Sequence, residues 1–461
     1  MIPQPVLCLV SFLTLILGAQ PEPEARAQKD AEARIRARFA EKYAKRSHAD
    51  LRALAYELFE EAAGPGGEPA ARFVLLRETA DLAAQGGDAE TAFDAIDELA
   101  REFEVDGLQR KLAALSRAER AVQGPEDARA LAEGAFGLFR GLIEKDDFEE
   151  ARNLSRRAAA WAKQAQSAAL AARAQEYQKE LSRLHGESVR VKGREKTLSQ
   201  KPGDPVASSE LGRFLCAVKG NWEKGVPLLV KGPDGPLRTV AAKEEGGPAD
   251  PAGAREVGEL WSRIAEKEGG PFEREEILRH ALSWYARAGE KVPDLERQVA
   301  PREAKVVLGK RVRSKGLSPR PHGDGLYQAV FLAGKPCVRL DRKDERDRAR
   351  YLYFDIADDW AALASGQEIE LEIECYDNPP GPFTVEYNSQ KSSYRGAPKP
   401  VTLSGKSAWK VIRLDLPEAL FRNAQNARSD LRIRREPGAA LYVHRVTVRR
   451  VEDEPGARKK K

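Results

Sequence analysis

The sequence predicts a multidomain protein with an all-α helical-repeat region followed by an all-β antiparallel sandwich. The chain has 461 residues, which is more than one hydrophobic core usually serves. Apolar residues recur at a helical period through residues 28–309, and the period changes to two from residue 326 onward. A basic stretch rich in Pro and Gly, residues 310–325, separates the two patterns. We expect this stretch to be the linker between the domains.

The composition supports folded domains and excludes two classes of protein. Hydrophobic residues make up 41% of the chain and charged residues 32%, which is not the composition of a membrane-embedded protein. The 77 Lys and Arg residues exceed the 72 Asp and Glu residues only slightly, giving a formal charge of +5. Because this small excess is spread along the chain, no nucleic-acid partner is expected.

Residues 1–27 are predicted to be a signal peptide. The apolar run VLCLVSFLTLIL, residues 6–17, is too short to span a bilayer comfortably and matches the core of such a peptide. Gly18, Ala19 and the segment Ala25–Ala27 supply small residues for cleavage. No Lys or Arg precedes the run, so an uncleaved N-terminal anchor is the alternative. We expect a secreted, periplasmic or cell-envelope protein without a further transmembrane segment.

The region 28–309 is predicted to be a series of amphipathic helices. In the first of them, Ile35 and Phe39 recur with Tyr43 every four residues and so share one face. Each helix is apolar on one side only and must bury that side against its neighbours. Residues 232–253, rich in Gly and Pro, are expected to be an irregular insert. The last helix is expected over residues 295–308.

Three turns in this region share a pattern of a turn pair, an apolar residue, Glu and a small residue. The turn pairs are Gly87-Asp88, Asp146-Asp147 and Gly220-Asn221. The Asp or Asn is expected to cap the next helix, and the small residue allows two helices to approach closely. With the helix start DPVASSELG at residues 204–212, these turns resemble those of tetratricopeptide repeats. Their spacings, 59 and 74 residues, are not multiples of the repeat length of about 34 residues. The resemblance therefore implies an irregular, tetratricopeptide-like scaffold with a protein partner bound through the helices.

Residues 326–452 are predicted to form the β-sandwich, and residues 453–461 a basic tail. In EIELEIEC, residues 368–375, glutamates alternate with apolar residues, which is typical of a sheet with one wet face. Residues 351–376 are expected to form two strands joined by an acidic loop. The nine strands expected are residues 329–331, 338–340, 351–356, 368–375, 383–387, 401–403, 410–416, 431–434 and 441–448.

Several segments of this domain resemble the jelly-roll modules of the galactose-binding and carbohydrate-binding type on secreted bacterial proteins. The segments are YFDI at 353–356 before DDW at 358–360, YD at 376–377, FTVEYN at 383–388, SAWK at 407–410, and FRNAQN at 421–426 leading into DLRI at 430–433. The resemblance implies a jelly-roll fold. It also implies a carbohydrate or cell-envelope glycan as the ligand, bound by loops at strand ends.

Sugar recognition needs flat aromatic faces and polar groups that bond to hydroxyls, and such residues lie at the predicted strand ends. The loop NSQKSSYRGAPKP, residues 388–400, is expected to expose its tyrosine. A structural role is the alternative for each residue, as core for the strand-end tyrosines and as turn caps for Asn423 and Asn426 of FRNAQN. The candidate ligand residues are Tyr376, Asp377, Tyr387, Asn388, Tyr394, Arg395 and Asn423.

The sequence indicates neither catalytic chemistry nor a firm metal site or disulfide. It contains no HExxH, GxSxG or dinucleotide-binding GxGxxG motif, and its five histidines are scattered. Asp358 and Asp359 are expected in the acidic loop, either solvated or holding a structural calcium ion, the one cofactor considered. Cys337 and Cys375 either pair or remain buried thiols, and the second interpretation is favoured.

We therefore expect a secreted, non-catalytic binding protein that presents a glycan-binding sandwich. The alternative is a structural or protein-interaction protein of the cell envelope, with the sandwich as a docking module.

Overall fold

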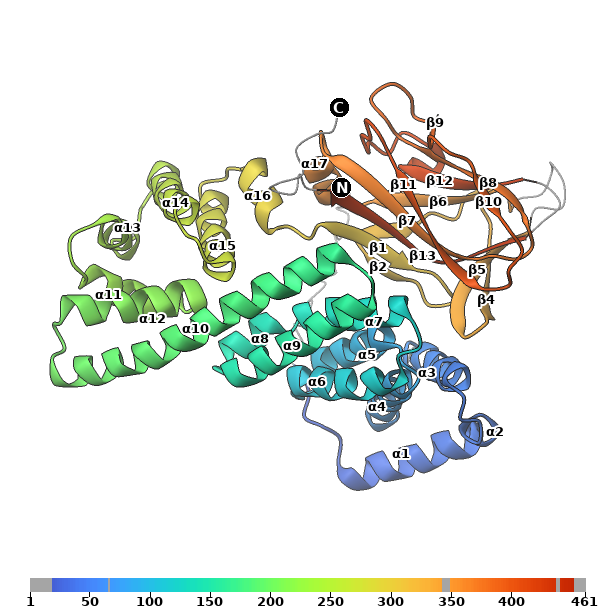
Figure 1. The fold of residues 1–461 in the computed structure, drawn as a ribbon, viewed down its shortest axis with the longest axis horizontal. Helices are drawn as coiled ribbons and strands as arrows, with labels where there is room; N and C mark the ends of the chain where they lie inside the picture. Colours follow the sequence, from blue (N-terminus) through green and yellow to red (C-terminus); the bar gives the residue numbers. More distant parts are fainter. Residues whose placement is uncertain (1–18, 65–66, 342–348, 437–439, 452–461) are drawn as a thin grey trace, which may run out of the picture. The chain divides into compact units, whose positions relative to one another are not determined.

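The computed structural model describes residues 19–64, 67–341, 349–436 and 440–451. The chain divides into two compact units, residues 1–122 and 123–461. Helices extend to Val299, and two antiparallel sheets follow (Figure 1), which confirms the predicted fold class. The apolar core of the predicted signal peptide and the basic tail lie outside the described residues. Among the helices described, none has both the length and the apolar character to cross a membrane.

The first unit is helical and is held together by a core that includes Phe59, Phe73 and Phe103. The rings of Phe73 and Phe103 meet edge to face with centroids 5.1 Å apart. Its helices are α1 (Ala25–Arg38), α2 (Ala40–Tyr43), α3 (His48–Ala62), α4 (Pro69–Gln85), α5 (Ala89–Glu102), α6 (Gly107–Ala118) and the short 3₁₀ helix η1 (Glu119–Ala121).

The second unit begins with the remaining helices of the series. They are α7 (Pro125–Phe136), α8 (Phe139–Glu144), α9 (Phe148–Gln164), α10 (Ala168–Gln200), α11 (Pro205–Arg213), the π-helical turn η2 (Phe214–Val218), α12 (Trp222–Val230), α13 (Pro236–Glu245), α14 (Pro251–Glu266), α15 (Pro271–Arg287) and α16 (Pro293–Val299). A core around Trp261, Ile277 and Trp284 joins α12 to α15.

The three recurring turns act as the sequence predicts. The side chains of Asp88, Asp147 and Asn221 each accept a hydrogen bond from the backbone N–H three residues later, at 2.9, 3.2 and 3.2 Å. At the third turn the small residue is Gly225, which packs closely against Cys216. Each cap satisfies a backbone donor that the first turn of a helix leaves unpaired, so these residues fix where α5, α9 and α12 begin.

The sandwich consists of a seven-stranded and a six-stranded sheet. The first contains β11 (Trp409–Asp415), β7 (Glu368–Tyr376), β13 (Ala440–Val451), β1 (Glu303–Val307) and β2 (Arg313–Lys315) in that order, with β5 (Lys335–Asp341) on β13 and β4 (Gln328–Leu332) on β5. The second contains β10 (Val401–Leu403), β8 (Gly381–Tyr387), β12 (Leu431–Arg435), β6 (Tyr351–Ile356) and β3 (Leu317–Pro319), with β9 (Arg395–Gly396) on β8.

The alternation of side chains along these strands builds one core between the sheets. Phe354 of β6, Ile373 of β7, Ile433 of β12 and Val446 of β13 are all fully buried in it. The intervening residues of each strand lie on the outer faces, as a period of two requires. On the seven-stranded sheet the outer residues of β7 are the glutamates of EIELEIEC, but the predicted wet face is only partly wet: Glu368 is exposed, whereas Glu372 and Glu374 are buried and paired with Arg413 and Arg445.

The β region begins earlier than the sequence predicts. Residues 295–308 are not one helix, because α16 ends at Val299 and β1 runs from Glu303 to Val307. Strands β2 and β3 lie within the predicted linker. The run Val306-Val307 consists of β-branched residues, which favour strands, and β1 lies between β13 and β2 in its sheet. A short apolar run cannot be assigned to helix or strand by its period alone.

The predicted irregular insert, residues 232–253, is also more regular than expected. It contains all of α13 and the start of α14. Pro236 and Pro251 occupy the first position of these helices, where a missing N–H costs no intrahelical hydrogen bond. The prolines therefore mark helix starts rather than an absence of helix.

Candidate functional site

Tyr376 and Asp377, at the end of β7, organise a turn. The two carboxylate oxygens of Asp377 accept hydrogen bonds from the backbone N–H and the hydroxyl of Ser404, both at 2.5 Å. The bond from this hydroxyl is the main cause that lowers the pKa of Asp377. Asp377 is only 2% exposed, whereas Tyr376 is half-buried and donates its hydroxyl to the carbonyl of Ser407 at 2.9 Å. These contacts favour the structural alternative for Asp377.

Tyr387 and Asn388 are both buried. The Tyr387 hydroxyl donates to the carbonyl of Pro417 at 2.9 Å. The Asn388 side-chain oxygen accepts the backbone N–H of Ala424 at 3.0 Å, while its amide nitrogen donates to the carbonyl of Ser393 at 2.9 Å. Asn388 thus ties together two loops at one end of the six-stranded sheet, which again favours a structural role.

Asn423 lies in the second of these loops with a left-handed backbone, φ 57°. Its side-chain nitrogen donates to Asp358 at 2.7 Å. The predicted acidic loop is wrong at this point, because Asp358 and Asp359 form the first turn of a helix, α17 (Asp358–Ala364). Carboxylates in the first turn of a helix are stabilised by the helix dipole. Across the described part of the chain, no three His, Cys, Asp or Glu residues lie close enough to hold a metal ion.

Tyr394 is exposed, as predicted, with 37% of its surface accessible. The guanidinium of Arg432 lies 4.2 Å from the centroid of its ring and 4.1 Å from that of Tyr351. The side-chain oxygen of Asn426 accepts a hydrogen bond from the Tyr394 hydroxyl at 3.0 Å. Arg432 donates to Glu386 at 2.5 Å. We call Tyr394, Tyr351, Arg432, Asn426 and Glu386 the Tyr394 surface. Arg395, which the sequence also predicts as a ligand residue, bonds elsewhere, to Pro417 and Glu418.

Two further members of the Tyr394 surface, Arg432 and Tyr351, could have been found from the sequence. In LRIR, residues 431–434, the period of two places Arg432 and Arg434 on the wet face of β12. The same alternation in YLYFDI places Tyr351 and Tyr353 together on the outer face of β6, the neighbouring strand, although the structure buries both side chains there. What the sequence does not show is that β6 and β12 are neighbours.

The three cysteines within the described residues are buried thiols. Cys216, Cys337 and Cys375 are free, and burial raises the pKa of each thiol, to about 12 for the latter two. The favoured interpretation, without a disulfide, is therefore confirmed. His444 is buried as well, and burial lowers its pKa to about 4. None of these groups is poised as a nucleophile or base at neutral pH.

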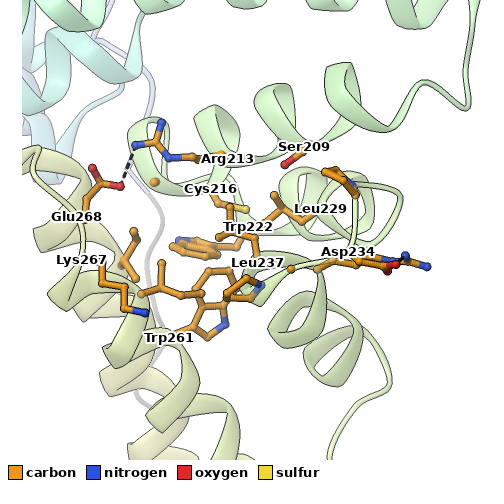
Figure 2. A pocket seen from close by; sticks show the side chains of 17 residues that line it. Ser209, Arg213, Cys216, Trp222, Leu229, Asp234, Leu237, Trp261, Lys267 and Glu268 are labelled. Carbon is orange, nitrogen blue, oxygen red and sulfur yellow. Dashed lines mark hydrogen bonds and ion pairs between the residues drawn. The ribbon is translucent and has the colours of Figure 1, made fainter.

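A cavity of about 310 Å³ lies among the helices of the second unit, in a region where the sequence indicates no site (Figure 2). Trp222 and Trp261 form one wall, with ring centroids 5.0 Å apart in an edge-to-face arrangement. The other lining residues come from α11 to α15 and from the loop before α13. They are Ser209, Arg213, Cys216, Ala217, Leu229, Pro233, Asp234, Gly235, Pro236, Leu237, Arg238, Ile264, Lys267, Glu268 and Ile277.

Polar contacts behind this wall hold the two indoles in place. The indole N–H of Trp261 donates to Glu244 at 2.6 Å, and that of Trp222 donates to Glu276 at 3.1 Å. His280 lies flat on Trp222 and contacts Glu244 through its Nε2 at 2.9 Å. Each indole therefore has a hydrogen-bond partner, and His280 covers one face of Trp222.

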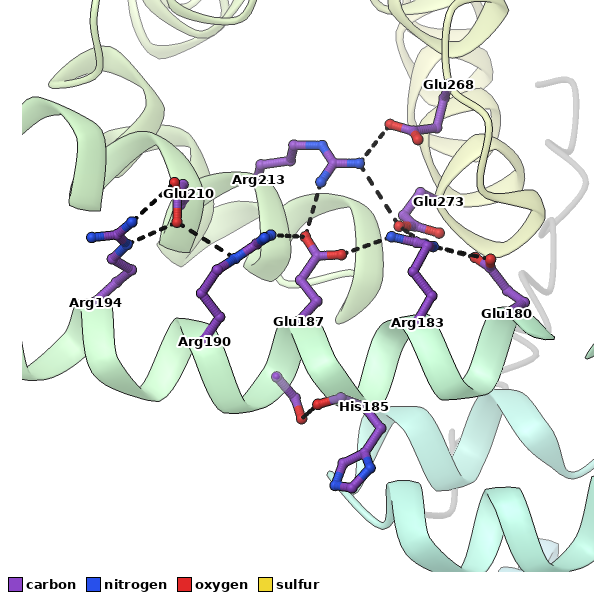
Figure 3. Close-up of polar contacts among 11 residues, drawn as sticks. Glu180, Arg183, His185, Glu187, Arg190, Arg194, Glu210, Arg213, Glu268 and Glu273 are labelled. Carbon is purple, nitrogen blue, oxygen red and sulfur yellow. Dashed lines mark hydrogen bonds and ion pairs between the residues drawn. The ribbon is translucent and has the colours of Figure 1, made fainter. Parts of the chain in front are cut away.

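A chain of arginines and glutamates connects α10 to the mouth of the cavity (Figure 3). Arg183 pairs with Glu187 at 2.8 Å and with Glu273, and Arg213 pairs with Glu187 at 2.9 Å and with Glu268 at 2.8 Å. Glu273 is fully buried, and burial raises its pKa to about 7. These pairs join α10 to α11, α15 and the segment before it, so they fix the helices that surround the cavity.

The chain matches no protein-family model and no curated protein in comparisons with known proteins. It is therefore placed by its architecture, a helical region followed by an antiparallel β-sandwich.

Proposed function

We propose that the protein is a non-catalytic binding protein in which a helical scaffold presents a glycan-binding β-sandwich. The Tyr394 surface is the observation that supports this proposal. It combines an exposed aromatic ring with hydrogen-bonding groups, which are the two elements that sugar recognition needs. The ring of Tyr394 stacks on the C–H face of a pyranose, while Asn426 and Glu386 bond to its hydroxyls.

The charges of this surface favour a neutral glycan. Arg432 is paired with Glu386, and Arg434 with Glu436 at 3.1 Å. Because each guanidinium already faces a carboxylate, the surface offers donors and acceptors but little unmatched charge. An uncharged sugar loses less solvation on such a surface than an acidic one does.

The packing beneath the ring makes Tyr394 a rigid platform. Arg432 lies against it, and Asn426 donates its backbone N–H to the Tyr394 hydroxyl at 3.0 Å. A side chain held at both its face and its hydroxyl loses little conformational entropy when a ligand stacks on it. This geometry favours Tyr394 over Tyr387, whose ring is fully buried.

The test is binding of the full chain to an array of neutral and acidic glycans. We expect at least one neutral polysaccharide to bind and Tyr394→Ala to weaken it about tenfold, because an aromatic contact contributes about 1 kcal/mol or more. Tyr442→Ala is the matched control, since Tyr442 is a half-buried tyrosine of the seven-stranded sheet. Failure to bind any glycan, or equal loss in both variants, would overturn the proposal.

The predicted signal peptide supports a location outside the cytoplasm for this activity, since envelope and extracellular glycans are found there. Expression of the full chain in a bacterial host, followed by fractionation, tests this placement. We expect a processed chain in the periplasm or medium. An unprocessed chain that remains in the cytoplasm would contradict it.

A further inference from the structure

The cavity among α11 to α15 has the size and lining of a small-molecule site. Its volume of about 310 Å³ is near the lower limit of such sites, so it suits one ring or a short acyl chain. Trp222 and Trp261 supply aromatic faces, and Leu229 and Ile277 supply aliphatic surface. The π-helical turn, Phe214–Val218, contributes Cys216 and Ala217 to another wall; such turns often occur at functional sites.

The carboxylates around the cavity are already engaged. Glu268 pairs with Arg213 at 2.8 Å, and this pair lies beside the cavity in Figure 2. Glu276 and Glu244 each accept a hydrogen bond from an indole N–H of the wall. Asp234, which also lines the cavity, is paired with Arg238, so a cationic ligand would find no free carboxylate among these four groups.

One basic group at the mouth differs from the others. Lys267, which follows the last residue of α14, lines the cavity and is exposed. Its ammonium makes no ion pair with any residue in the described ranges of the chain, whereas Arg213 is paired with Glu268 and Arg238 with Asp234. The charge that remains unmatched at the mouth is therefore positive.

We propose that this cavity binds a small amphipathic carboxylate. The apolar body of the ligand lies against Trp222 and Trp261, and its carboxylate pairs with the ammonium of Lys267. The apolar contacts supply most of the binding energy, and the ion pair at the rim sets the preference for an anion. This site is separate from the Tyr394 surface and does not depend on the glycan proposal.

The probes are octanoate and octanamide, which share an acyl chain and differ in charge. Binding to the full chain is measured at pH 7.5 by titration calorimetry and by indole fluorescence. We expect octanoate to bind, to change the fluorescence, and to bind about tenfold more tightly than octanamide, since tenfold corresponds to about 1.4 kcal/mol. Lys267→Gln should remove that preference and leave octanamide binding unchanged.

Two further variants test whether the probes bind in the cavity and whether the effect is specific to Lys267. Leu237→Trp places a larger side chain in the cavity and should abolish binding of both probes, with circular dichroism showing that the fold is intact. Lys224→Gln removes an exposed lysine of α12 that does not line the cavity and should leave both affinities unchanged. The proposal is overturned if octanoate does not bind, if octanamide binds equally well, or if Leu237→Trp still binds octanoate.

Discussion

The indole of Trp222 and the imidazole of His280 lie face to face, with centroids 3.6 Å apart and planes 2° from parallel. This stack joins α12 to α15 and fixes the orientation of an indole that lines the cavity. His280 also contacts Glu244 at 2.9 Å, so one ring supports both indoles of the wall. The shape of the cavity therefore depends on a residue that does not itself line it.

We expect His280→Ala to lower the free energy of unfolding by about 2 kcal/mol, because it removes the stack and one hydrogen-bond partner of Glu244. Urea denaturation of the full chain, followed by tryptophan fluorescence, measures the loss. His280→Phe keeps a flat ring against Trp222 but lacks the ring nitrogen, so it should recover part of the lost free energy of unfolding. Wild-type stability in the alanine variant would show that the stack does not hold the wall.

A second prediction concerns pH. Burial raises the pKa of Glu273 to about 7, against the opposing hydrogen bond from Arg183. The folded protein thus holds this proton more tightly than the unfolded chain does. The resulting stabilisation is fully present below about pH 4.5 and is lost as the pH rises through 7.

Glu273→Gln, which stays uncharged, should remove this part of the pH dependence. Denaturant unfolding at several values between pH 5 and pH 8 measures it, and the slope against pH should be flatter in the variant than in the wild type. Glu275→Gln is the matched control, because Glu275 lies on the same helix with 45% of its side chain exposed. An equal slope in Glu273→Gln and the wild type would contradict the assignment.

The sandwich was more predictable than the helical region. Its strands have a period of two that is visible in sequences such as EIELEIEC, and the structure has a strand at each of the nine expected positions. The strands that were missed, β1 to β3 and β9, are short or lie beside Pro and Gly, where the period cannot be read. The helix α17 was missed for a similar reason, since its seven residues span only two turns.

The candidate sites show a different limit. Sequence can place Tyr394 in a loop and therefore expose it, and the structure agrees. The sequence cannot show that the side chain of Asn388 forms hydrogen bonds with backbone groups in the surrounding loops, because that depends on which loops lie together in the fold. The same limit applies to the cavity, because the sequence does not show which of its residues lie together. Trp222 and Trp261 are 39 residues apart in the chain and come together only through the packing of α12 on α14 and α15.

A third prediction concerns the charged outer face of the seven-stranded sheet. Glu374 is buried there, with Arg445 at 3.1 Å and Lys335 also paired to it. Burial opposes its ionisation, but the positive charges of His444, Lys335 and Arg445 prevail, and the pKa falls to about 2. The stabilisation is therefore present above about pH 4.5 and is lost as the pH falls toward 2.

Glu374→Gln should cost about 3 kcal/mol at pH 7, because it takes away the carboxylate that the half-buried charges of Lys335 and Arg445 share. The loss should shrink as the pH falls from 4.5 to 2.5, because the unfolded wild-type chain takes up a proton at Glu374 in this range while the folded protein still holds the carboxylate. Thermal unfolding of both proteins across this range measures the difference. A gap between the two that stays constant with pH would show that the charge of Glu374 contributes nothing.

The last prediction concerns the close approach of α11 and α12. A Cβ added at Gly225 would overlap the sulfur of Cys216 and lie 2.9 Å from the carbonyl oxygen of Gly212. Gly225→Ala should therefore cost about 2 kcal/mol, despite the better helix propensity of alanine, because the helices must separate. Gly186→Ala in α10 is the control: its Cβ meets open space, and it should gain about 0.5–1 kcal/mol. Denaturant unfolding distinguishes the two, and a stabilising Gly225→Ala would show that the helices are not in close contact there.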